Sequence, residues 1–348
     1  MTSVKAYGAQ SATSGLAPLT ITRRTLRAND VAIEIDYCGV CHSDLHSVAN
    51  DWGRAHYPLV PGHEIIGRVC AVGAEVKTFK PGDRVGVGCM VDACLTCSAC
   101  QQGEEQYCLQ HPVMTYNDLD NIDRTRTYGG YSNMIVVRQE FVIQLPANLN
   151  PATAAPILCA GITTYSPLKY LKVGKGHKVG VLGMGGLGHM AVKFAKAMGA
   201  EVTIFTRSEA KREEAKRQGA DHVVISTDQN QMRGAREQFD FLLDTIPVEH
   251  DYNPYLRCLK YNGVHMVVGQ FTELTPALDT GELLLKRRSL VGSFIGGIAE
   301  TKECLEFCAE HGIECDVEML NMADINYAYE RLKKGDVKYR FVIDMATL

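Results

Sequence analysis

The spacing of apolar residues changes near residue 150 and separates two kinds of segment. Before that point, residues 31–37 (VAIEIDY) alternate between apolar and polar positions, as the two faces of a half-buried strand do. A Pro-Gly-Asp turn leads into a second expected strand at 84–87, and residues 131–137 (YSNMIVV) form a third. Glycine and proline separate these segments. The pattern predicts an irregular, mainly β domain.

After residue 150, short apolar runs alternate with helical stretches. Strands are expected at 178–182, 202–205, 223–225, 239–243 and 264–268, with helices at 187–198 and 208–218. Such alternation is typical of a doubly wound α/β fold, in which helices cover both faces of a parallel sheet. The C-terminal segment predicts two helices and one strand, at 302–310, 325–333 and 341–344.

Composition and charge narrow the class of protein without changing this picture. With 348 residues the chain can form two medium domains, and its 46% hydrophobic and 22% charged content is that of a folded protein. A net charge of −4 and the lack of a long basic run argue against a nucleic-acid partner. The N-terminus lacks the apolar core of a signal peptide, and no run of about eighteen apolar residues occurs. We therefore expect a cytoplasmic protein with no membrane partner.

Cysteine is frequent, and its placement favours a metal site over disulfides. An odd count of thirteen and the missing export signal argue against a disulfide framework. Four cysteines are spaced so that one loop can wrap around a tetrahedral zinc ion: Cys94, Cys97, Cys100 and Cys108. Such a closed site is structural, with an iron–sulfur cluster or redox-active thiols as alternatives. The other seven are expected to be reduced and mostly buried: Cys38, Cys70, Cys89, Cys258, Cys304, Cys308 and Cys315.

A glycine-rich turn joins the expected strand at 178–182 to the helix at 187–198. Its sequence is Gly183-Met-Gly185-Gly186-Leu187-Gly188. Glycines at this spacing let the turn tighten and let the backbone approach a pyrophosphate at the helix N-terminus. A merely tight turn is the alternative, but the strand–turn–helix setting favours a dinucleotide site.

The end of the next strand distinguishes NAD from NADP. An NAD site usually places Asp or Glu there, whereas this chain has Thr206-Arg207-Ser208, followed by Lys211. Hydroxyls and cations suit a dianionic 2′-phosphate, which Arg207 can hold through several donors. Glu209 weakens this interpretation, and Lys211 could instead belong to a solvated helix face. We expect NADP(H).

Three separated motifs supply further candidate ligands. Cys41 lies in GVCHSDLH, His63 and Glu64 lie in PGHEIIG, and Cys159 begins CAGITT. Each alone is more often a packed core residue than a ligand. Together, and with the full GHE-x2-G-x5-G-x2-V signature from Gly62 onward, they closely resemble the medium-chain zinc-dependent alcohol dehydrogenases. The similarity covers essentially the whole chain and is nearest to the cinnamyl alcohol dehydrogenase branch and the bacterial aldehyde reductases similar to it.

The resemblance implies two zinc ions per chain. Cys41, His63 and Cys159 would hold a catalytic ion and leave its fourth position open, while the cysteine quartet would hold a structural ion. Glu64 would lie behind the catalytic ion and could ligate it in the absence of substrate. Asp44 would hydrogen-bond His63 and fix its tautomer.

The activity implied is hydride transfer between NADP(H) and primary alcohols or aldehydes, with zinc as a Lewis acid on the substrate oxygen. Ser43 would pass a proton through the nicotinamide ribose to His46. Further cofactor contacts are implied at six positions: Thr163, Thr245, Gly269, Ser293, Phe294 and Ile295.

The substrate pocket is less well defined by the resemblance. Trp52 and Phe294 would form apolar walls, although Trp52 could equally be a core residue. A further wall residue, aromatic in the plant enzymes, falls at Val113 or Met114, and neither is aromatic. We therefore expect an aldehyde reductase that accepts aromatic or medium-chain aliphatic tails, and not cinnamyl substrates alone.

The resemblance also implies a domain plan. Residues 1–150 with 296–348 would form a zinc-bearing, GroES-like catalytic domain, and residues 151–295 a Rossmann cofactor domain. The active site would lie in a cleft between them. Because dimers are common in the family, we expect a homodimer that acts on a small-molecule aldehyde or alcohol.

Three other functions compete with this one. The cations at 206–212 disfavour an NAD-linked polyol or formaldehyde-handling enzyme. A zinc-free quinone reductase of the same superfamily would lack both cysteine sets. A non-catalytic, cofactor-sensing relative would have lost a ligand or a relay residue, and this chain keeps them all.

Overall fold

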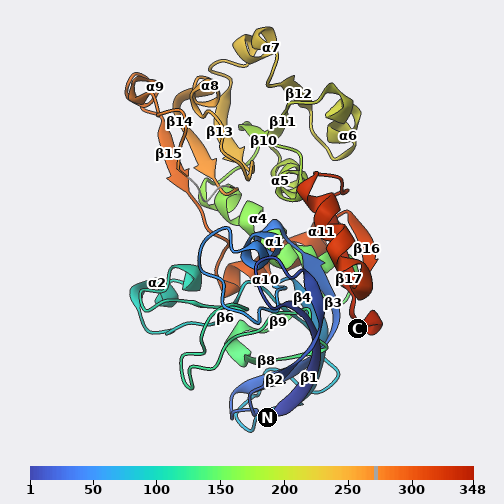
Figure 1. The fold of residues 1–348 in the computed structure, drawn as a ribbon. Helices are drawn as coiled ribbons and strands as arrows, with labels where there is room; N and C mark the ends of the chain where they lie inside the picture. Colours follow the sequence, from blue (N-terminus) through green and yellow to red (C-terminus); the bar gives the residue numbers. More distant parts are fainter. Residues whose placement is uncertain (270–272) are drawn as a thin grey trace. The chain divides into compact units, whose positions relative to one another are not determined.

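The computed structural model describes residues 1–269 and 273–348 (Figure 1). Within them the chain separates into two compact units. The first combines Met1–Cys159 with Gly296–Leu348, and the second is the continuous segment Ala160–Ile295. The chain therefore leaves the first unit, builds the second, and returns to finish the first.

The first unit is built mainly from antiparallel strands. Its strands are β1 (Thr2–Ala9), β2 (Leu16–Arg23), β3 (Asp30–Val40), β4 (Ile65–Val72), β5 (Arg84–Val87), β6 (Met90–Asp92), β7 (Val113–Met114), β8 (Met134–Arg138), β9 (Ile143–Gln144), β16 (Val317–Asn321) and β17 (Arg340–Asp344). The main sheet has the order β16-β17-β3-β4-β5-β9, with β8 also paired to β3. Only β16 and β17 run parallel in it. β1 with β2, and β6 with β7, form two-stranded sheets.

Strand β3 is central to this sheet because its apolar side chains are buried along nearly its whole length. One edge of β3 pairs first with β8 and then with β17, while β4 covers the other edge. Cys38 near the end of β3 stands opposite Ile65 at the start of β4. The chain leaving β3 and the chain entering β4 therefore lie side by side.

Short helices surround this sheet. They are α1 (His42–Ala49), α2 (Ser98–Gln101), α3 (Pro151–Ala154), α10 (Ile298–His311) and α11 (Ile325–Lys333), with single 3-10 turns at Glu105–Tyr107, Gln139–Phe141, Ala155–Leu158, Met322–Asp324 and Met345–Thr347. Helix α1 begins directly after β3, with Cys41 at its N-cap. The Asp44 side chain bonds back to the Cys41 backbone, as in a capping box. Asn50 ends the helix in the left-handed conformation at φ 59°.

The second unit is a six-stranded parallel sheet with helices. Its strands are β10 (Lys178–Leu182), β11 (Glu201–Thr206), β12 (His222–Ile225), β13 (Phe239–Asp244), β14 (Leu259–Val267) and β15 (Ser289–Gly292). Its helices are α4 (Ala160–Tyr170), α5 (Gly186–Ala197), α6 (Arg212–Arg217), α7 (Gln229–Gly234), α8 (Asn253–Leu256) and α9 (Thr280–Leu284), with a 3-10 turn at Glu209–Lys211. The sheet order is β12-β11-β10-β13-β14-β15.

From β10 the chain adds β11 and β12 toward one edge of the sheet, and then β13, β14 and β15 toward the other edge. The winding of the chain therefore reverses between the neighbouring strands β10 and β13. In open α/β sheets, ligands bind beyond the carboxyl ends of the strands at such a switch point. The core beneath is apolar because Leu182, Phe205 and Leu242 come from three neighbouring strands and are buried together. The predicted fold class, a doubly wound parallel sheet plus an irregular mainly β region, is confirmed.

Several predicted segments differ in detail from the observed ones. The strand predicted at 131–137 starts only at Met134, because the Tyr131 backbone bonds instead to Pro61 and Tyr7. The helix predicted at 208–218 divides into a 3-10 turn followed by α6. β15 has no counterpart among the predicted strands. Among the described residues, no helix is long and apolar enough to span a membrane.

Candidate active site

Four side chains with metal-ligating atoms converge in the first unit. The ligand atoms of Cys41, His63, Glu64 and Cys159 all lie within 4.8 Å of one another, and all four residues are buried. Strand pairing brings them together: Cys41 follows β3, His63 and Glu64 precede β4, and Gly39 donates its backbone N–H to the Glu64 carbonyl at 2.9 Å. Cys159 ends the 3-10 turn Ala155–Leu158, which packs against β3, β4 and β5.

The spacing of these atoms suits a tetrahedral ion. The Cys41 and Cys159 sulfurs are 3.9 Å apart, and His63 Nε2 is 3.2 Å from the Cys159 sulfur. Zinc bonds of ~2.0–2.3 Å place tetrahedral ligands about 3.3–3.8 Å from one another. Two thiolates and one imidazole therefore fit zinc in both chemistry and distance, with a position left for a further ligand.

Asp44 fixes the orientation of two of these groups. Its Oδ1 lies 3.0 Å from His63 Nδ1 and accepts the Gly62 N–H at 3.1 Å, and its Oδ2 accepts the Cys41 N–H at 2.9 Å. Because a carboxylate only accepts, His63 Nδ1 carries the proton and Nε2 keeps its lone pair for a metal. The contact expected between Asp44 and His63 is thus present.

Glu64 is a buried carboxylate with unsatisfied oxygens. The residue is fully buried, and among the described residues neither Oε1 nor Oε2 accepts a hydrogen bond. Burial raises the pKa of Glu64 to about 7, although the Arg340 guanidinium, 3.4 Å from Oε1, opposes that rise. Buried polar groups without partners are rare, so these oxygens indicate a missing ligand.

Arg340, Tyr116 and Cys89 also belong to this site, and sequence reasoning gave them no role. Arg340 reaches it because β17 pairs with β3, and its Nη1 also donates to the Val40 carbonyl at 3.2 Å. The Tyr116 ring lies 5.8 Å from that of His63. A hydrogen bond with Cys159 lowers the pKa of Cys89, against the effect of burial. In the sequence, only the run Arg340-Phe-Val-Ile-Asp344 drew attention to one of these residues. That run does not reveal which side chains Arg340 contacts.

The expected proton-relay residues lie on or near α1. The Cys41 sulfur is 3.7 Å from the Ser43 hydroxyl. His46 is partly exposed, and its Nδ1 is 2.7 Å from Asp51 Oδ2. The Trp52 ring packs 5.5 Å from the His46 ring and is 40% exposed, so Trp52 is not a core residue.

The cysteine quartet forms a second candidate metal site. The sulfurs of Cys94, Cys97, Cys100 and Cys108 lie within 4.8 Å of one another, and those of Cys94 and Cys100 are 3.8 Å apart. Backbone N–H groups point at the sulfurs: Thr96 and Cys97 donate to Cys94 at 3.5 and 3.3 Å. These bonds lower the pKa of Cys94 to about 6, which favours the thiolate that zinc requires.

The glycine-rich turn follows β10 as expected. Gly183 has a φ of 92°, and a Cβ on Gly188 would lie 2.2 Å from the Gly183 carbonyl oxygen, so neither position accepts a side chain without strain. A Cβ on Gly185 would meet nothing within 4 Å. Helix α5 begins at Gly186 without a side-chain cap, which leaves the first N–H groups, including that of Leu187, available to an anion.

Polar groups surround this turn from neighbouring strands. Lys211 Nζ is 3.4 Å from the Met184 carbonyl, so the ammonium lies over the turn. Thr206 is buried, and its hydroxyl accepts the Ser208 N–H at 3.3 Å. Glu209 pairs with Arg212, whose Nη2 donates at 3.0 Å. Among the described residues, neither Arg207 nor Lys211 forms an ion pair.

The remaining expected cofactor residues also lie in the second unit. Thr163 is buried in α4, and Thr245 follows β13 with its hydroxyl donating to the Leu182 carbonyl at 2.7 Å. Gly269 packs so closely on Thr245 that a Cβ would lie 2.5 Å from the Thr245 carbonyl carbon. Three consecutive residues follow β15: Ser293, Phe294 and Ile295.

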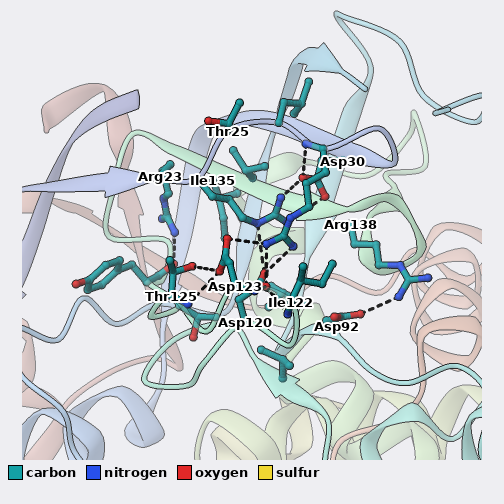
Figure 2. A pocket seen from close by; sticks show the side chains of 18 of the residues that line it. Arg23, Thr25, Asp30, Asp92, Asp120, Ile122, Asp123, Thr125, Ile135 and Arg138 are labelled. Carbon is teal, nitrogen blue, oxygen red and sulfur yellow. Dashed lines mark hydrogen bonds and ion pairs between the residues drawn. The ribbon is translucent and has the colours of Figure 1, made fainter. Parts of the chain in front are cut away.

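One cavity of about 600 Å³ in the first unit, shown in Figure 2, is lined by no residue of either metal-type cluster. Ion pairs line it: Arg27 holds Asp120 through two contacts of 2.9 Å, Arg24 pairs with Asp30, and Arg138 contacts Asp92 at 3.0 Å. The contacts of Arg24 and Arg27 with Asp120 tie the loop around Asp120 to the segment between β2 and β3.

Comparisons with known proteins agree with this geometry. Residues 27–147 match the alcohol dehydrogenase GroES-like domain and residues 186–310 the zinc-binding dehydrogenase domain. The chain is 52% identical to aldehyde reductase YahK of Escherichia coli over 99% of both chains. It is 48% identical to NADP-dependent alcohol dehydrogenase C of Mycobacterium tuberculosis over 100% of both.

Solved structures show the same relationship. A cinnamyl alcohol dehydrogenase from Sorghum bicolor superposes with a TM-score of 0.96 at 43% identity, covering 99% of this chain and 98% of that one. The CAD from Helicobacter pylori, complexed with NADP(H), has a TM-score of 0.93 at 43% identity and 99% coverage of both. The predicted family is confirmed: this chain belongs to the zinc-binding, GroES-like alcohol dehydrogenases and is an oxidoreductase.

Proposed function

We propose that this protein interconverts aldehydes and primary alcohols with NADP(H), at a zinc ion held by Cys41, His63 and Cys159. The observation that carries the proposal is the convergence of these three buried donors beside the unsatisfied carboxylate of Glu64. Zinc bound there would polarise the substrate oxygen. Glu64 would be a further ligand when that position holds no substrate, and the quartet would hold a second, structural zinc.

The protein's own groups position and move protons. Asp44 holds His63 in the tautomer that leaves Nε2 free. The Ser43 hydroxyl, close to the Cys41 sulfur, would give or take the substrate proton. His46, partly exposed and hydrogen-bonded to Asp51, would exchange that proton with water.

We further propose that the second unit is the cofactor domain and that it prefers NADP(H). Gly183, Gly185, Gly186, Leu187 and Gly188 would receive the pyrophosphate. Arg207 and Lys211, with the Thr206 and Ser208 hydroxyls, would hold the 2′-phosphate, since the ion pair with Arg212 neutralises Glu209. The relative from Helicobacter pylori supports this preference. Further contacts are proposed at Thr163, Thr245, Gly269, Ser293, Phe294 and Ile295.

For substrates we propose aldehydes with aromatic or medium-chain aliphatic tails. The exposed ring of Trp52 beside His46 supports a role for Trp52 as a pocket wall, with Phe294 as another. Val113 is buried and lines the ion-pair cavity, which leaves its strand neighbour Met114 as the better third wall. A homodimer and a cytoplasmic location remain expectations from the family.

Initial rates of aldehyde reduction test the proposal. Benzaldehyde, cinnamaldehyde and formaldehyde would be assayed with NADPH and, separately, NADH by ultraviolet absorbance, on protein with measured zinc content. Formaldehyde is included because a relative from Bacillus subtilis, 48% identical, is named a probable formaldehyde dehydrogenase. We expect rapid turnover of the aromatic aldehydes with NADPH and little with NADH. Zinc-loaded protein that turns over none of them would contradict the proposal.

A further inference from the structure

The loop that follows β13 packs directly on the glycine-rich turn. Thr245 donates both its N–H and its hydroxyl to the Leu182 carbonyl, at 3.1 and 2.7 Å. A Cβ on Gly183 would lie 3.3 Å from the Ile246 side chain. On the other side, Gly269 donates its N–H to the Asp244 carbonyl at 3.1 Å. This loop is therefore in direct contact with the turn that is proposed to bind the dinucleotide.

Asp244 organises the loop from beneath. Its carboxylate is 1% exposed; Oδ1 accepts the Ile246 N–H at 3.1 Å, and Oδ2 lies 2.8 Å from His250 Nε2 and 3.0 Å from His265 Nε2. Because a carboxylate only accepts hydrogen bonds, both Nε2 atoms must donate. The contact between the side chains of Asp244 and His250 therefore joins the two ends of the loop 244–250.

The second ring nitrogen of His250 also faces an acceptor. Its Nδ1 is 2.8 Å from the Val248 carbonyl oxygen, which accepts and cannot donate. A neutral imidazole has one N–H and can satisfy only one of these two oxygens. The two contacts therefore fit the imidazolium form of His250, which has an N–H for each oxygen.

Within residues 1–269 and 273–348, groups from several neighbouring segments face this ring. Asp244 comes from β13, and His265 comes from β14. Two tyrosine rings lie beside that of His250: Tyr252, just before α8, has its ring centroid 4.8 Å away, and Tyr255, within α8, has its ring centroid 6.0 Å away. Asp251 adds a negative charge from the loop. Burial lowers the pKa of His250, but the hydrogen bond and charge of Asp244 outweigh burial and raise it. The surroundings therefore stabilise the cation.

We infer that His250 is a positioning residue for NADP(H): as an imidazolium it clamps the loop between Asp244 and Val248 against the glycine-rich turn, and cofactor affinity falls when it loses its proton. This inference rests on the proposed function, because it takes the turn to be the dinucleotide site. Loss of the proton would break one of the two clamp bonds and remove a positive charge near a polyanionic ligand.

The test is the dissociation constant of NADPH, measured by calorimetry on the zinc-loaded protein between pH 7 and pH 9.5. Wild type should bind progressively more weakly as the pH rises. His250→Gln, which cannot carry the charge, should bind about tenfold more weakly at pH 7, the scale of one charge-assisted hydrogen bond, with a flatter profile. His250→Arg, which keeps a cation with several donors, should recover affinity at pH 9.5. His111→Gln, which removes an exposed His–Asp contact in the first unit, is the matched control.

Each outcome is decisive. Equal affinities and pH profiles for wild type and His250→Gln would overturn the inference and leave the proposed function standing. Wild type that does not bind NADPH at any pH would overturn both. If His250→Gln does not fold, His250→Arg decides: because arginine keeps its charge up to pH 9.5, a loss of affinity with pH as steep as that of wild type would overturn the inference.

Discussion

At the scale of single residues, the metal-type cluster is defined by what its groups lack. Among the described residues, neither buried oxygen of Glu64 accepts a hydrogen bond. Asp44 holds the His63 ring at Nδ1, which leaves Nε2 as the nitrogen that could bind a metal. A buried acceptor that faces nothing costs free energy unless a cation or donor occupies the space in front of it. Arg340, 3.4 Å from Oε1, supplies one positive charge, and a metal ion that accepts sulfur and nitrogen ligands would supply another.

Removing one proposed zinc ligand should abolish zinc binding at this site while the protein still folds. Cys159→Ala is expected to lose one zinc ion per chain and to reduce aldehyde turnover to background, because it removes one of the two thiolates that would hold the ion. The far-ultraviolet circular dichroism should be retained. Zinc content by mass spectrometry and initial rates give the result, with Cys70→Ala, an exposed thiol on β4, as control. Full turnover by zinc-depleted Cys159→Ala would exclude the mechanism.

The cofactor preference also depends on individual side chains. Arg207→Asp combined with Ser208→Ala removes phosphate donors and adds a repelling charge, so the NADPH-to-NADH ratio of kcat/KM should fall about a hundredfold or more. Arg233→Asp makes the same charge change on α7, and its ratio should stay that of wild type. An unchanged ratio in the double variant would mean that the 2′-phosphate binds elsewhere.

At the scale of elements, the segments that could be predicted are those whose burial follows one simple period. β10, β11 and β13 are buried almost throughout and stand between glycine turns and amphipathic helices, so their apolar runs are recognisable. β15 is short and only partly buried, and nothing in its pattern separates it from a loop. The four thiols of the quartet and the Gly-rich turn are local in sequence, and spacing alone identifies them.

Contacts between distant elements could not be predicted in this way. Arg340 meets Glu64 only because β17 pairs with β3, and His265 meets Asp244 only because β14 lies next to β13. Tyr116 and Cys89 reach the metal-type cluster through irregular loops. Spacing along the chain contains no information about such pairings, whereas the resemblance to a family supplied the ligands but not these supporting residues.

The quartet loop should behave as a separately stabilised element. It consists of short turns around four sulfurs, with Glu105 accepting the Ile298 N–H at 3.0 Å as a tie to the C-terminal segment. Cys97→Ser should lose one zinc ion and lower the melting temperature, by about 2–4 °C for each kcal/mol lost. Calorimetric scanning with zinc analysis measures both, and Cys70→Ser, at an exposed thiol on β4, is the control. A variant with two zinc ions and an unchanged melting temperature would contradict a structural metal here.

At the scale of the whole molecule, the ion pairs around the cavity link stability to acid. Burial raises the pKa of Asp120, but the hydrogen bonds from Arg27 and from backbone N–H groups outweigh burial and lower it to about 2. A carboxyl with a depressed folded-state pKa stabilises the native state above its unfolded pKa of about 3.9 and loses that contribution as the pH falls.

Arg27→Met should therefore lower the free energy of unfolding by about 1 kcal/mol at pH 6, the scale of a partly exposed ion pair. The difference from wild type should shrink as the pH falls below about 4 and should vanish only below about 2, because the unfolded chain takes up the proton of Asp120 at about pH 3.9 and the wild-type native state takes it up at about pH 2. Urea unfolding at several pH values measures it, and Lys302→Met on an exposed helix face is the control. A difference that does not change with pH would show that Asp120 is not the linked group.

The return of the chain to its first unit has a consequence for how the protein is made. Ala160–Ile295 is continuous and can close as soon as it has left the ribosome, whereas the main sheet of the first unit waits for β17, at residues 340–344. Domains completed early during translation generally fold first. The second unit should therefore become native before the first, and Arg340 reaches the buried carboxyl of Glu64 only after β17 has been synthesised.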